Sequence, residues 1–430
     1  MRDNTISIGE AWEILFERHQ IAQRVEEDGC FRISAAEINT VREARLMAKF
    51  DQSLRLPEVF RRNRLSILPV TRGEYVIGPF ETHAKVEYTE VPVKQVRIPG
   101  LLTIDYTNLY SEASALLFAY NSGIFEDASG EERLYFTVNG RMASGNFSFR
   151  IRDVSQPDTY RKLSVMNAQV EIDGGYEGEN VFLICEAKNI AAEELLIRQL
   201  YYPWRLWQGK LSKRAVPVFM VYSNDIFHLF FYQFADVMNY NSLELISHKA
   251  YTFADETIAG RDLEAAFYAV GEPGLEPEAV FPQADSFERV VDLLSVLYER
   301  SLTRDEVTLY YEFDERQTNY YISACEYLGL ITRGMNEARE RVYSLTKEAA
   351  GLMGTCYKEK YLGLVKRILV RPVFYHVFFL SLFRREVPDK QAVIQVLKEF
   401  RPELSDSTLI RRSATVRGWI AWIWKLAKDG

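Results

Sequence analysis

The chain has 430 residues, which is enough for two to four domains with hydrophobic cores of their own. Its composition, 47% hydrophobic and 26% charged, is ordinary for a globular protein; the most apolar run, Val373 to Phe383, is too short to span a bilayer, and no signal-peptide pattern opens the chain. The four cysteines have no zinc-type spacing, so we expect a cytoplasmic protein with reduced thiols and no membrane contact.

The net charge of −8 argues at first against a nucleic-acid partner, but the charge is unevenly distributed. Residues 357–430 contain 15 Lys and Arg against 7 Asp and Glu, a local charge of +8, which leaves −16 for the rest of the chain. A basic segment on an acidic body suits a protein that meets phosphate with one part of its surface.

Residues 1–98 combine a helical start with a β-hairpin. Apolar residues at helical spacing follow Ser7, a residue type that caps helices, and predict a helix to about residue 30. Leu65 to Val76 has turn residues from Pro69 to Gly73, which predicts a hairpin. A helix followed by a two-stranded wing is typical of a winged-helix-like DNA-binding domain. Four basic side chains here either contact phosphate or form a solvated face: Arg61, Arg62, Arg64 and Arg72.

Residues 99–270 form the next predicted domain, which begins at Pro99-Gly100 and mixes helices with strands. A helix is expected from Asn108 to Asn121, and strands at 132–138 and 146–151 are expected to flank an Asn139-Gly140 turn. Four more strands and one helix follow in the prediction: Val170–Asp173, Val181–Ile184, the helix 191–200, then 216–222 and 226–234. Residues 235–284 are rich in Gly and Pro and are expected to be loops and a linker.

The strand that ends in Glu186 and Lys188 is the most informative stretch. Gly174-Gly175 and Gly178 predict a hairpin that places Asp173 beside Glu186, and strand alternation puts Glu186 and Lys188 on one face. Two carboxylates at close range form a hard-oxygen site of the type that Mg²⁺ prefers, and a lysine beside them can orient or activate water for attack on phosphorus. The alternative is a solvated, salt-bridged face. We expect the amide of Gln199 to face back toward the sheet. There it would hydrogen-bond DNA phosphate or a metal-bound water, or it would have a structural role.

Asp173 followed by Glu186-Ala187-Lys188 resembles the PD-(D/E)xK nuclease signature, with Ile172 in place of its proline. The longer runs 183–189 and 197–203 resemble the core of a group of type II restriction endonucleases. The resemblance implies an α/β nuclease sandwich that uses Mg²⁺, held by Asp173 and Glu186. It also implies a third acidic ligand on the preceding helix, for which Glu112 is the candidate; Glu112 equally suits the helix dipole.

Residues 285–353 predict a winged helix-turn-helix domain. An amphipathic helix follows Asp285, capping boxes begin at Thr303 and Asp314, and a β-hairpin covers 330–345. The third helix would enter the major groove by its N-terminal residues. The side chains that could read or contact DNA are Arg316, Gln317, Asn319, Tyr320 and, in the wing, Arg333. The alternative is a winged helix that binds protein.

Residues 354–430 predict a C-terminal helix-turn-helix DNA-binding domain, with helices at 388–400 and 406–424. The second helix is expected to bury Ile410 and four other apolar residues. Its three arginines are the candidate DNA contacts: Arg411, Arg412 and Arg417.

Together these patterns predict an α+β or α/β protein, a nuclease sandwich flanked by winged helix-turn-helix domains. The predicted activity is that of a type II restriction endonuclease, which makes Mg²⁺-dependent double-strand cuts in DNA at a defined sequence. Cutting both strands at one site would need two active sites, hence a homodimer, and a cognate DNA methyltransferase would act on the same sequence. Two alternatives remain: a structure-specific repair or recombination nuclease, and a non-catalytic DNA-binding regulator.

Overall fold

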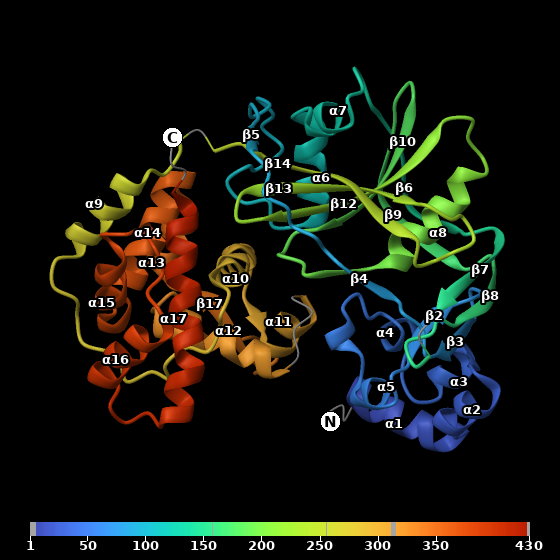
Figure 1. Cartoon of the computed structure of the whole chain (residues 1–430), viewed down its shortest axis with the longest axis horizontal. Helices are drawn as coiled ribbons and strands as arrows, with labels where there is room; N and C mark the ends of the chain where they lie inside the picture. The colour runs from blue at the N-terminus through green and yellow to red at the C-terminus, as the bar shows by residue number, and fades with distance from the viewer. Residues whose placement is uncertain (1–5, 157, 255, 311–314, 428–430) are drawn as a thin grey trace.

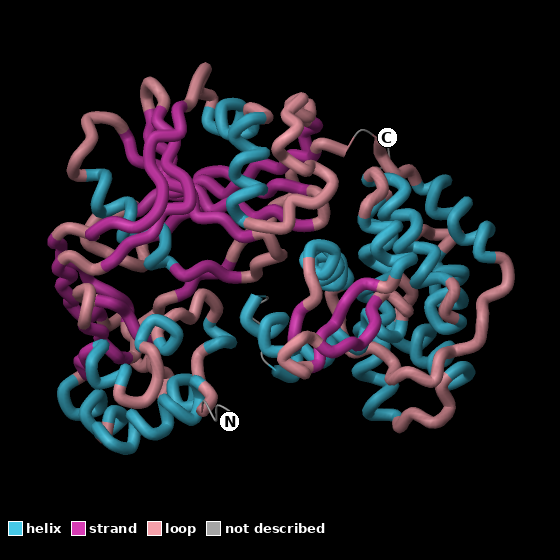
Figure 2. The backbone as a smooth tube through the Cα atoms, turned by 180° about the vertical axis from the view of Figure 1, so that it is seen from behind, coloured by secondary structure: helices cyan, strands magenta, loops and turns pink. Residues whose placement is uncertain are grey.

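The computed structural model describes residues 6–156, 158–254, 256–310 and 315–427, which form three units (Figure 1). We call residues 6–78 the N-terminal unit, 79–252 the central unit and 260–427 the C-terminal unit. Figure 2 shows that most strands gather in the central unit, whereas helices dominate the C-terminal unit. The architecture is mixed α/β around a central mixed sheet.

The N-terminal unit packs short helices against a three-stranded sheet of order β1-β3-β2. Its elements are α1 (Ile8–His19), α2 (Ile21–Asp28), β1 (Phe31–Ser34), α3 (Ala35–Asn39), α4 (Ala44–Met47), the 3-10 helix η1 (Ser53–Arg55), α5 (Glu58–Arg62), β2 (Ser66–Pro69) and β3 (Glu74–Gly78). The Ser7 cap and the hairpin are confirmed, but the expected first helix breaks at Gln20, whose φ is 51°. The Trp12 and Phe60 rings meet edge to face at the centre of its core, 4.8 Å apart.

The central unit is built on a seven-stranded mixed sheet of order β5-β14-β13-β12-β10-β9-β6. Two smaller sheets, β11-β4 and β7-β8, complete the unit. The strands of the whole unit are β4 (His83–Lys85), β5 (Val93–Gln95), β6 (Tyr135–Ala143), β7 (Asn146–Arg152), β8 (Tyr160–Met166), β9 (Gln169–Glu177), β10 (Val181–Lys188), β11 (Glu194–Leu196), β12 (Arg214–Ser223), β13 (Ile226–Phe234) and β14 (Leu243–Thr252). One core joins the sheet to α6 (Glu112–Asn121) and α7 (Ile124–Ser129), and a second core joins its other face to α8 (Ile197–Gln208) and the β7–β8 hairpin.

Several expected boundaries in this unit are wrong. Asn139-Gly140 lies inside β6, which pairs with β9, while β7 pairs with β8; Gly174-Gly175 likewise lies inside β9, and the chain turns at 178–180 instead. The helix expected at 191–200 begins six residues later, after β11, and runs on through Pro203. The expected loop region 235–284 contains β14 and α9 (Gly260–Val270). Residues 83–95, which the sequence grouped with the N-terminal domain, hydrogen-bond into the central unit, since β4 pairs with β11 and β5 with β14.

The C-terminal unit begins with α9. Three helices with a small sheet of order β15-β17-β16 come next, and the remaining helices, from α13 on, follow them. Its elements are α10 (Phe287–Glu299), β15 (Leu302–Thr303), α11 (Arg304–Tyr310), α12 (Glu315–Tyr327), β16 (Ile331–Met335), β17 (Arg341–Leu345), α13 (Lys347–Met353), α14 (Tyr357–Leu369), α15 (Pro372–Ser381), α16 (Lys390–Phe400) and α17 (Asp406–Leu426). The Thr303 capping box, the hairpin and the last two helices are confirmed; the cap expected at Asp285 is Ser286, and Asp314 lies outside the described residues. Ile410 is not buried but 47% exposed. No helix in the described ranges has the length and apolar character to cross a membrane.

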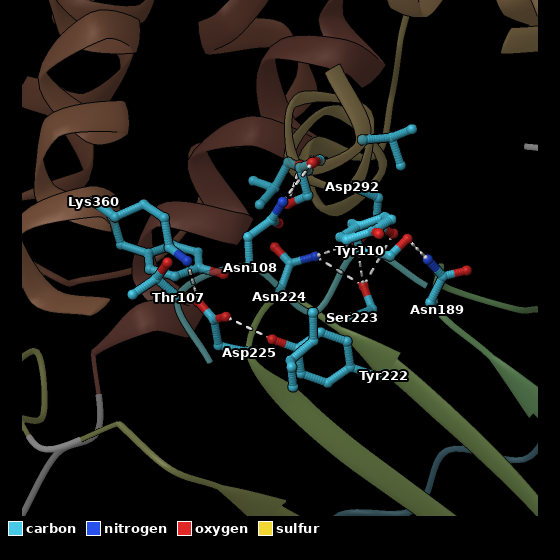
Figure 3. A pocket seen from close by; sticks show the side chains of 15 residues that line it. Thr107, Asn108, Tyr110, Asn189, Tyr222, Ser223, Asn224, Asp225, Asp292 and Lys360 are labelled. Atoms are coloured by element: carbon cyan, nitrogen blue, oxygen red, sulfur yellow. Dashed lines mark hydrogen bonds and ion pairs between the residues drawn. The ribbon is translucent and has the colours of Figure 1, made fainter. Parts of the chain in front are cut away.

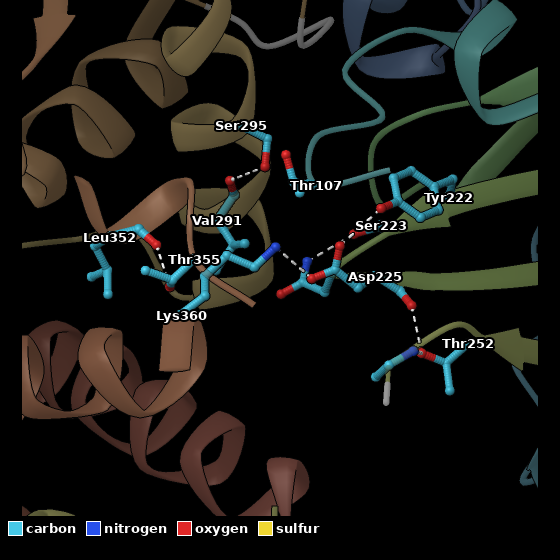
Figure 4. A network of polar contacts seen from close by, with 12 residues as sticks. Thr107, Tyr222, Ser223, Asp225, Thr252, Val291, Ser295, Leu352, Thr355 and Lys360 are labelled. Atoms are coloured by element: carbon cyan, nitrogen blue, oxygen red, sulfur yellow. Dashed lines mark hydrogen bonds and ion pairs between the residues drawn. The ribbon is translucent and has the colours of Figure 1, made fainter. Parts of the chain in front are cut away.

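Polar side chains join the central and C-terminal units at the β12–β13 turn. Lys360 of α14 reaches Asp225 in that turn, at 2.6 Å, and both residues are buried (Figure 4). Asp292 of α10 accepts hydrogen bonds from the backbone N–H of Ala191, at 2.9 Å, and from the hydroxyl of Ser223, at 2.9 Å, in the small pocket drawn in Figure 3. These buried contacts fix the C-terminal unit against one end of the central sheet.

Candidate active site

The end of β10 separates from β9, and the separation makes room for acidic side chains. Pairing between the two strands ends at Cys185 and Gly174, whereas β10 stays paired with β12 as far as Lys188. Beyond that point the N–H of Ala187 donates to the Asp173 carboxylate, at 2.9 Å, instead of to a strand carbonyl. The backbone of β10 therefore holds Asp173 in place beside the strand that carries Glu186.

The alternation of β10 decides which side chains enter this opening. Leu183, Cys185 and Ala187 pack toward α6, so Glu186 and Lys188 lie on the opposite face, toward α8. Glu186 is only 6% exposed, and its Oε1 lies 3.2 Å from the Lys188 Nζ. The prediction that these two residues share a face, near Asp173, is confirmed.

Lys188 lies among three carboxylates that come from three different parts of the chain. Its Nζ is 3.2 Å from Glu186 Oε1, 3.4 Å from Asp51 Oδ2 and 3.5 Å from Glu112 Oε1. Glu112 begins α6, and Asp51 belongs to the N-terminal unit, where its side chain is only 3% exposed. The ammonium group is thus fixed by charge and hydrogen bonding at the floor of the site.

Burial and mutual repulsion shift the acidic groups toward their neutral forms. Burial, and next the charge of Glu112, raise the pKa of Asp173 to about 6. Burial, and next the charge of Asp173, raise the pKa of Glu186 well above its usual range. Both directions follow from the cost of holding negative charge away from water and close to other negative charge. Perturbed carboxylates of this kind are frequent at functional sites.

Gln199 approaches the same carboxylate from α8. It lies in the first turn of the helix rather than near its end, and its Nε2 donates to Glu186 Oε1. Because α8 packs Leu200, Tyr201 and Trp204 into the core of that sheet face, the position of the amide is set by the helix and not by a loop. Gln199 therefore orients Glu186 in this structure.

All five predicted site residues border one cleft of about 530 Å³ between the central and N-terminal units: Asp173, Glu186, Lys188, Gln199 and Glu112. The wall that faces them comes from α4, the segment after it, and the β2–β3 turn. The cleft is open to solvent on one side, and Glu186 and Lys188 lie at its floor.

The donor set of the cleft suits a hard divalent cation. Asp173 and Glu186 both supply carboxylate oxygens as ligands. Their pKa values are raised, so the positive charge already near them does not offset the cost of ionising them in a buried place. Glu112, the third ligand expected, instead contacts Lys188. Over the ranges that the structure describes, no group of three or more His, Cys, Asp or Glu is arranged around a metal position. Two carboxylates, with water for the remaining positions, are the set that fits Mg²⁺.

The predicted DNA contacts of the C-terminal unit lie apart from this cleft. Arg316 and Asn319 are exposed on α12, and Gln317 and Tyr320 are half-buried. Arg333 forms an ion pair with Glu326.

The three arginines of α17 differ in their surroundings. Arg411 is exposed, Arg412 is half-buried and donates to Gln283, and the Nε of Arg417 donates to the carbonyl of Pro388 at 3.2 Å. Arg411 is thus the one whose side chain extends into solvent without a hydrogen bond assigned to it in the described structure.

Sequence reasoning missed the contribution of the N-terminal unit to the site. Asp51 is 137 positions from Lys188, and it stands in no recognisable motif. No local pattern could have found it, because only the packing of α4 and the following segment against the central unit brings it there.

Comparison with known families divides the chain in three. Residues 9–77, 78–252 and 289–428 match three families, each described as a domain of unknown function (DUF6996, DUF6997 and DUF7226, respectively). A search of curated proteins found no match, and neither did a search of solved structures.

Proposed function

We propose that this protein is a Mg²⁺-dependent type II restriction endonuclease. The observation that carries the proposal is the convergence of Asp173, Glu186 and Lys188 in one open cleft, from two neighbouring strands. The fold we infer for the central unit is a PD-(D/E)xK sandwich, supported by a mixed sheet with α6 and α7 on one face and α8 on the other.

Asp173 and Glu186 are the residues that would hold the metal ion. When bound there, Mg²⁺ would supply positive charge to the phosphate as negative charge develops on its oxygens. Lys188 is already fixed beside Glu186 at the floor of the cleft, where its positive charge would orient the attacking water and stabilise the hydroxide that forms from it. Gln199 and the Ala187 N–H hold the two carboxylates in position.

Sequence recognition is assigned to the C-terminal unit. Helices α10, α11 and α12 with the β15–β17 sheet follow the element order of a winged helix-turn-helix. Helix α12 presents Arg316 and Asn319 to solvent. Arg411 on α17 is a further candidate for a phosphate contact. We further propose that two copies act together on double-stranded DNA, one on each strand, and that a cognate methyltransferase protects the same sequence in the host.

The test is cleavage of phage DNA in the presence of Mg²⁺. Discrete fragments are expected from the wild-type protein, and Lys188→Met and Glu186→Gln are expected to lower the rate at least about 100-fold, as for loss of an acid–base group. Lys213→Met and Glu177→Gln are matched controls, because that pair is also a lysine–glutamate ion pair, 2.8 Å apart at one end of the sheet, but lies outside the cleft. Both controls should cut at the wild-type rate.

Other outcomes would replace this proposal with one of its rivals. A smear, or cutting of branched junctions alone, would assign a repair or recombination nuclease. A gel shift without any cutting would assign a DNA-binding regulator. Unchanged cutting by Lys188→Met would overturn the assignment of the active site.

A further inference from the structure

The cleft has a second wall that carries exposed positive charge and has no part in the chemistry described above. Arg45 lies on α4, Lys49 follows that helix, and Arg72 lies in the β2–β3 turn. All three are exposed and border the same cleft as Glu186 and Lys188. Within the described ranges, no ion pair or side-chain hydrogen bond is assigned to any of them.

Two more arginines lie on the wall across the cleft, one of them in an ion pair. Arg141 of β6 and Arg198 of α8 border it from the central unit; Arg141 is 3.3 Å from Glu171, and Arg198 is half-buried. Cations therefore stand on both sides of an acidic floor. Because that floor repels a phosphodiester, positive charge at the rim is what allows a polyanion to approach it.

We propose that the N-terminal unit is the second jaw of a duplex-binding cleft, in which Arg45, Lys49 and Arg72 bind backbone phosphates of double-stranded DNA beside the scissile one. This inference rests on the proposed nuclease function and extends it, by giving the substrate a place between two units. The buried contact of Asp51 with Lys188 ties the jaw to the active site, so the same packing that positions Lys188 also positions the three cations.

The three cations are suited to phosphate and not to base edges. Lys49 has no planar fork, and the three residues come from a helix, its exit and a turn rather than from one element that fits a groove. They should thus contribute affinity without sequence preference. Removing one phosphate-binding side chain should reduce the slope of log affinity against log salt by about 0.9.

The experiment measures binding of a short duplex DNA in EDTA, so that no hydrolysis occurs, at several salt concentrations. The triple variant Arg45→Gln/Lys49→Gln/Arg72→Gln should weaken binding and lower the salt slope by about 2.7 if all three side chains bind phosphate. The control is Arg18→Gln/Arg24→Gln/Arg32→Gln. These three residues belong to the same unit, are also exposed, and border neither of the clefts at this unit. Because three cations are again replaced, the net charge changes by the same amount. The control should keep the wild-type slope.

A second measurement does not depend on the stability of a triple variant. In the wild-type protein, duplex DNA should protect Lys49 from acetylation, as read by mass spectrometry, and should leave Lys162 reactive, an exposed lysine of β8 that does not border the cleft. Equal slopes for the two triple variants, or no protection of Lys49, would overturn the inference even if the wild-type protein cuts DNA. Tighter binding of RNA than of duplex DNA would overturn the partner. A lowered slope together with Lys49 protection, in a protein that never cuts, would leave this inference standing and refute the proposed nuclease function.

Discussion

Asp292 gives the most direct test of the electrostatics in this structure. It is fully enclosed where α10 meets the β12–β13 turn, and burial, which outweighs its hydrogen bonds, raises its pKa to about 7 (Figure 3). The substitution Asp292→Asn keeps an oxygen that accepts the N–H of Ala191 and removes the charge. Loss of Oδ1, which accepts from the Ser223 hydroxyl and from Nδ2 of Asn224, costs about 1 kcal/mol at every pH.

The expected size follows from the pKa values of the folded and unfolded chain. An unfolded aspartate has its ordinary pKa of 3.8, and the folded value is about 7; at about 1.4 kcal/mol per pKa unit, the difference amounts to about 4 kcal/mol. Because the folded pKa is the higher one, the folded state binds the extra proton between these values. The free energy of unfolding therefore has this contribution in full below about pH 4 and loses it as the pH rises to about 7.

Urea denaturation at pH 5, 6, 7 and 8 measures the effect. Relative to wild type, Asp292→Asn should gain stability from pH 5 to about pH 7 and show little further gain at pH 8. The control is Asp236→Asn, because the pKa of Asp236 is lowered by the backbone N–H of Met238 and its titration lies below the range. A wild-type-to-variant difference that stays constant from pH 5 to pH 8 would show that Asp292 is ionised throughout, and the reasoning would fail.

Two further predictions concern the metal site and the unit interface. Mg²⁺ at ten times its dissociation constant should stabilise the wild-type protein by about 1.4 kcal/mol, which a thermal melt would show as a higher melting midpoint. Asp173→Asn should abolish this rise in the midpoint, and Asp292→Asn should retain it. A rise in both variants would place the metal elsewhere. Lys360→Met leaves Asp225 buried without its cation and should cost about 3–5 kcal/mol in urea denaturation. The double variant with Asp225→Asn should recover most of that loss; equal losses would mean that the pair is not coupled.

The sequence predicted best the features that depend on neighbouring residues. The two-residue period of a strand placed Glu186 and Lys188 on one face, and the caps at Ser7 and Thr303 placed the starts of two helices correctly. In each case the physical cause lies within a few residues, in the strand period or in a hydrogen bond across one helical turn.

The errors arose where local signals compete with tertiary pairing. Asn139-Gly140 and Gly174-Gly175 have the composition of turns, yet both pairs lie in strands, where β6 and β9 pair with an irregular register. Glycine permits a turn and equally permits a close approach of strands. A Cβ on Gly175 would lie 2.8 Å from the side chain of Val138, so the neighbouring strand, and not a turn, explains that glycine.

Asp51 gives the N-terminal unit a part in positioning Lys188. If Glu186 and Glu112 were its only partners, Lys188 would be positioned by the central unit alone. The N-terminal unit would then have no part in positioning it. Asp51 changes this, since a buried carboxylate from that unit contacts the same ammonium group. Removing or displacing the unit would take one carboxylate away from Lys188 and would remove one wall of the cleft at the same time. One packing interface therefore both positions Lys188 and forms a wall of the proposed substrate cleft.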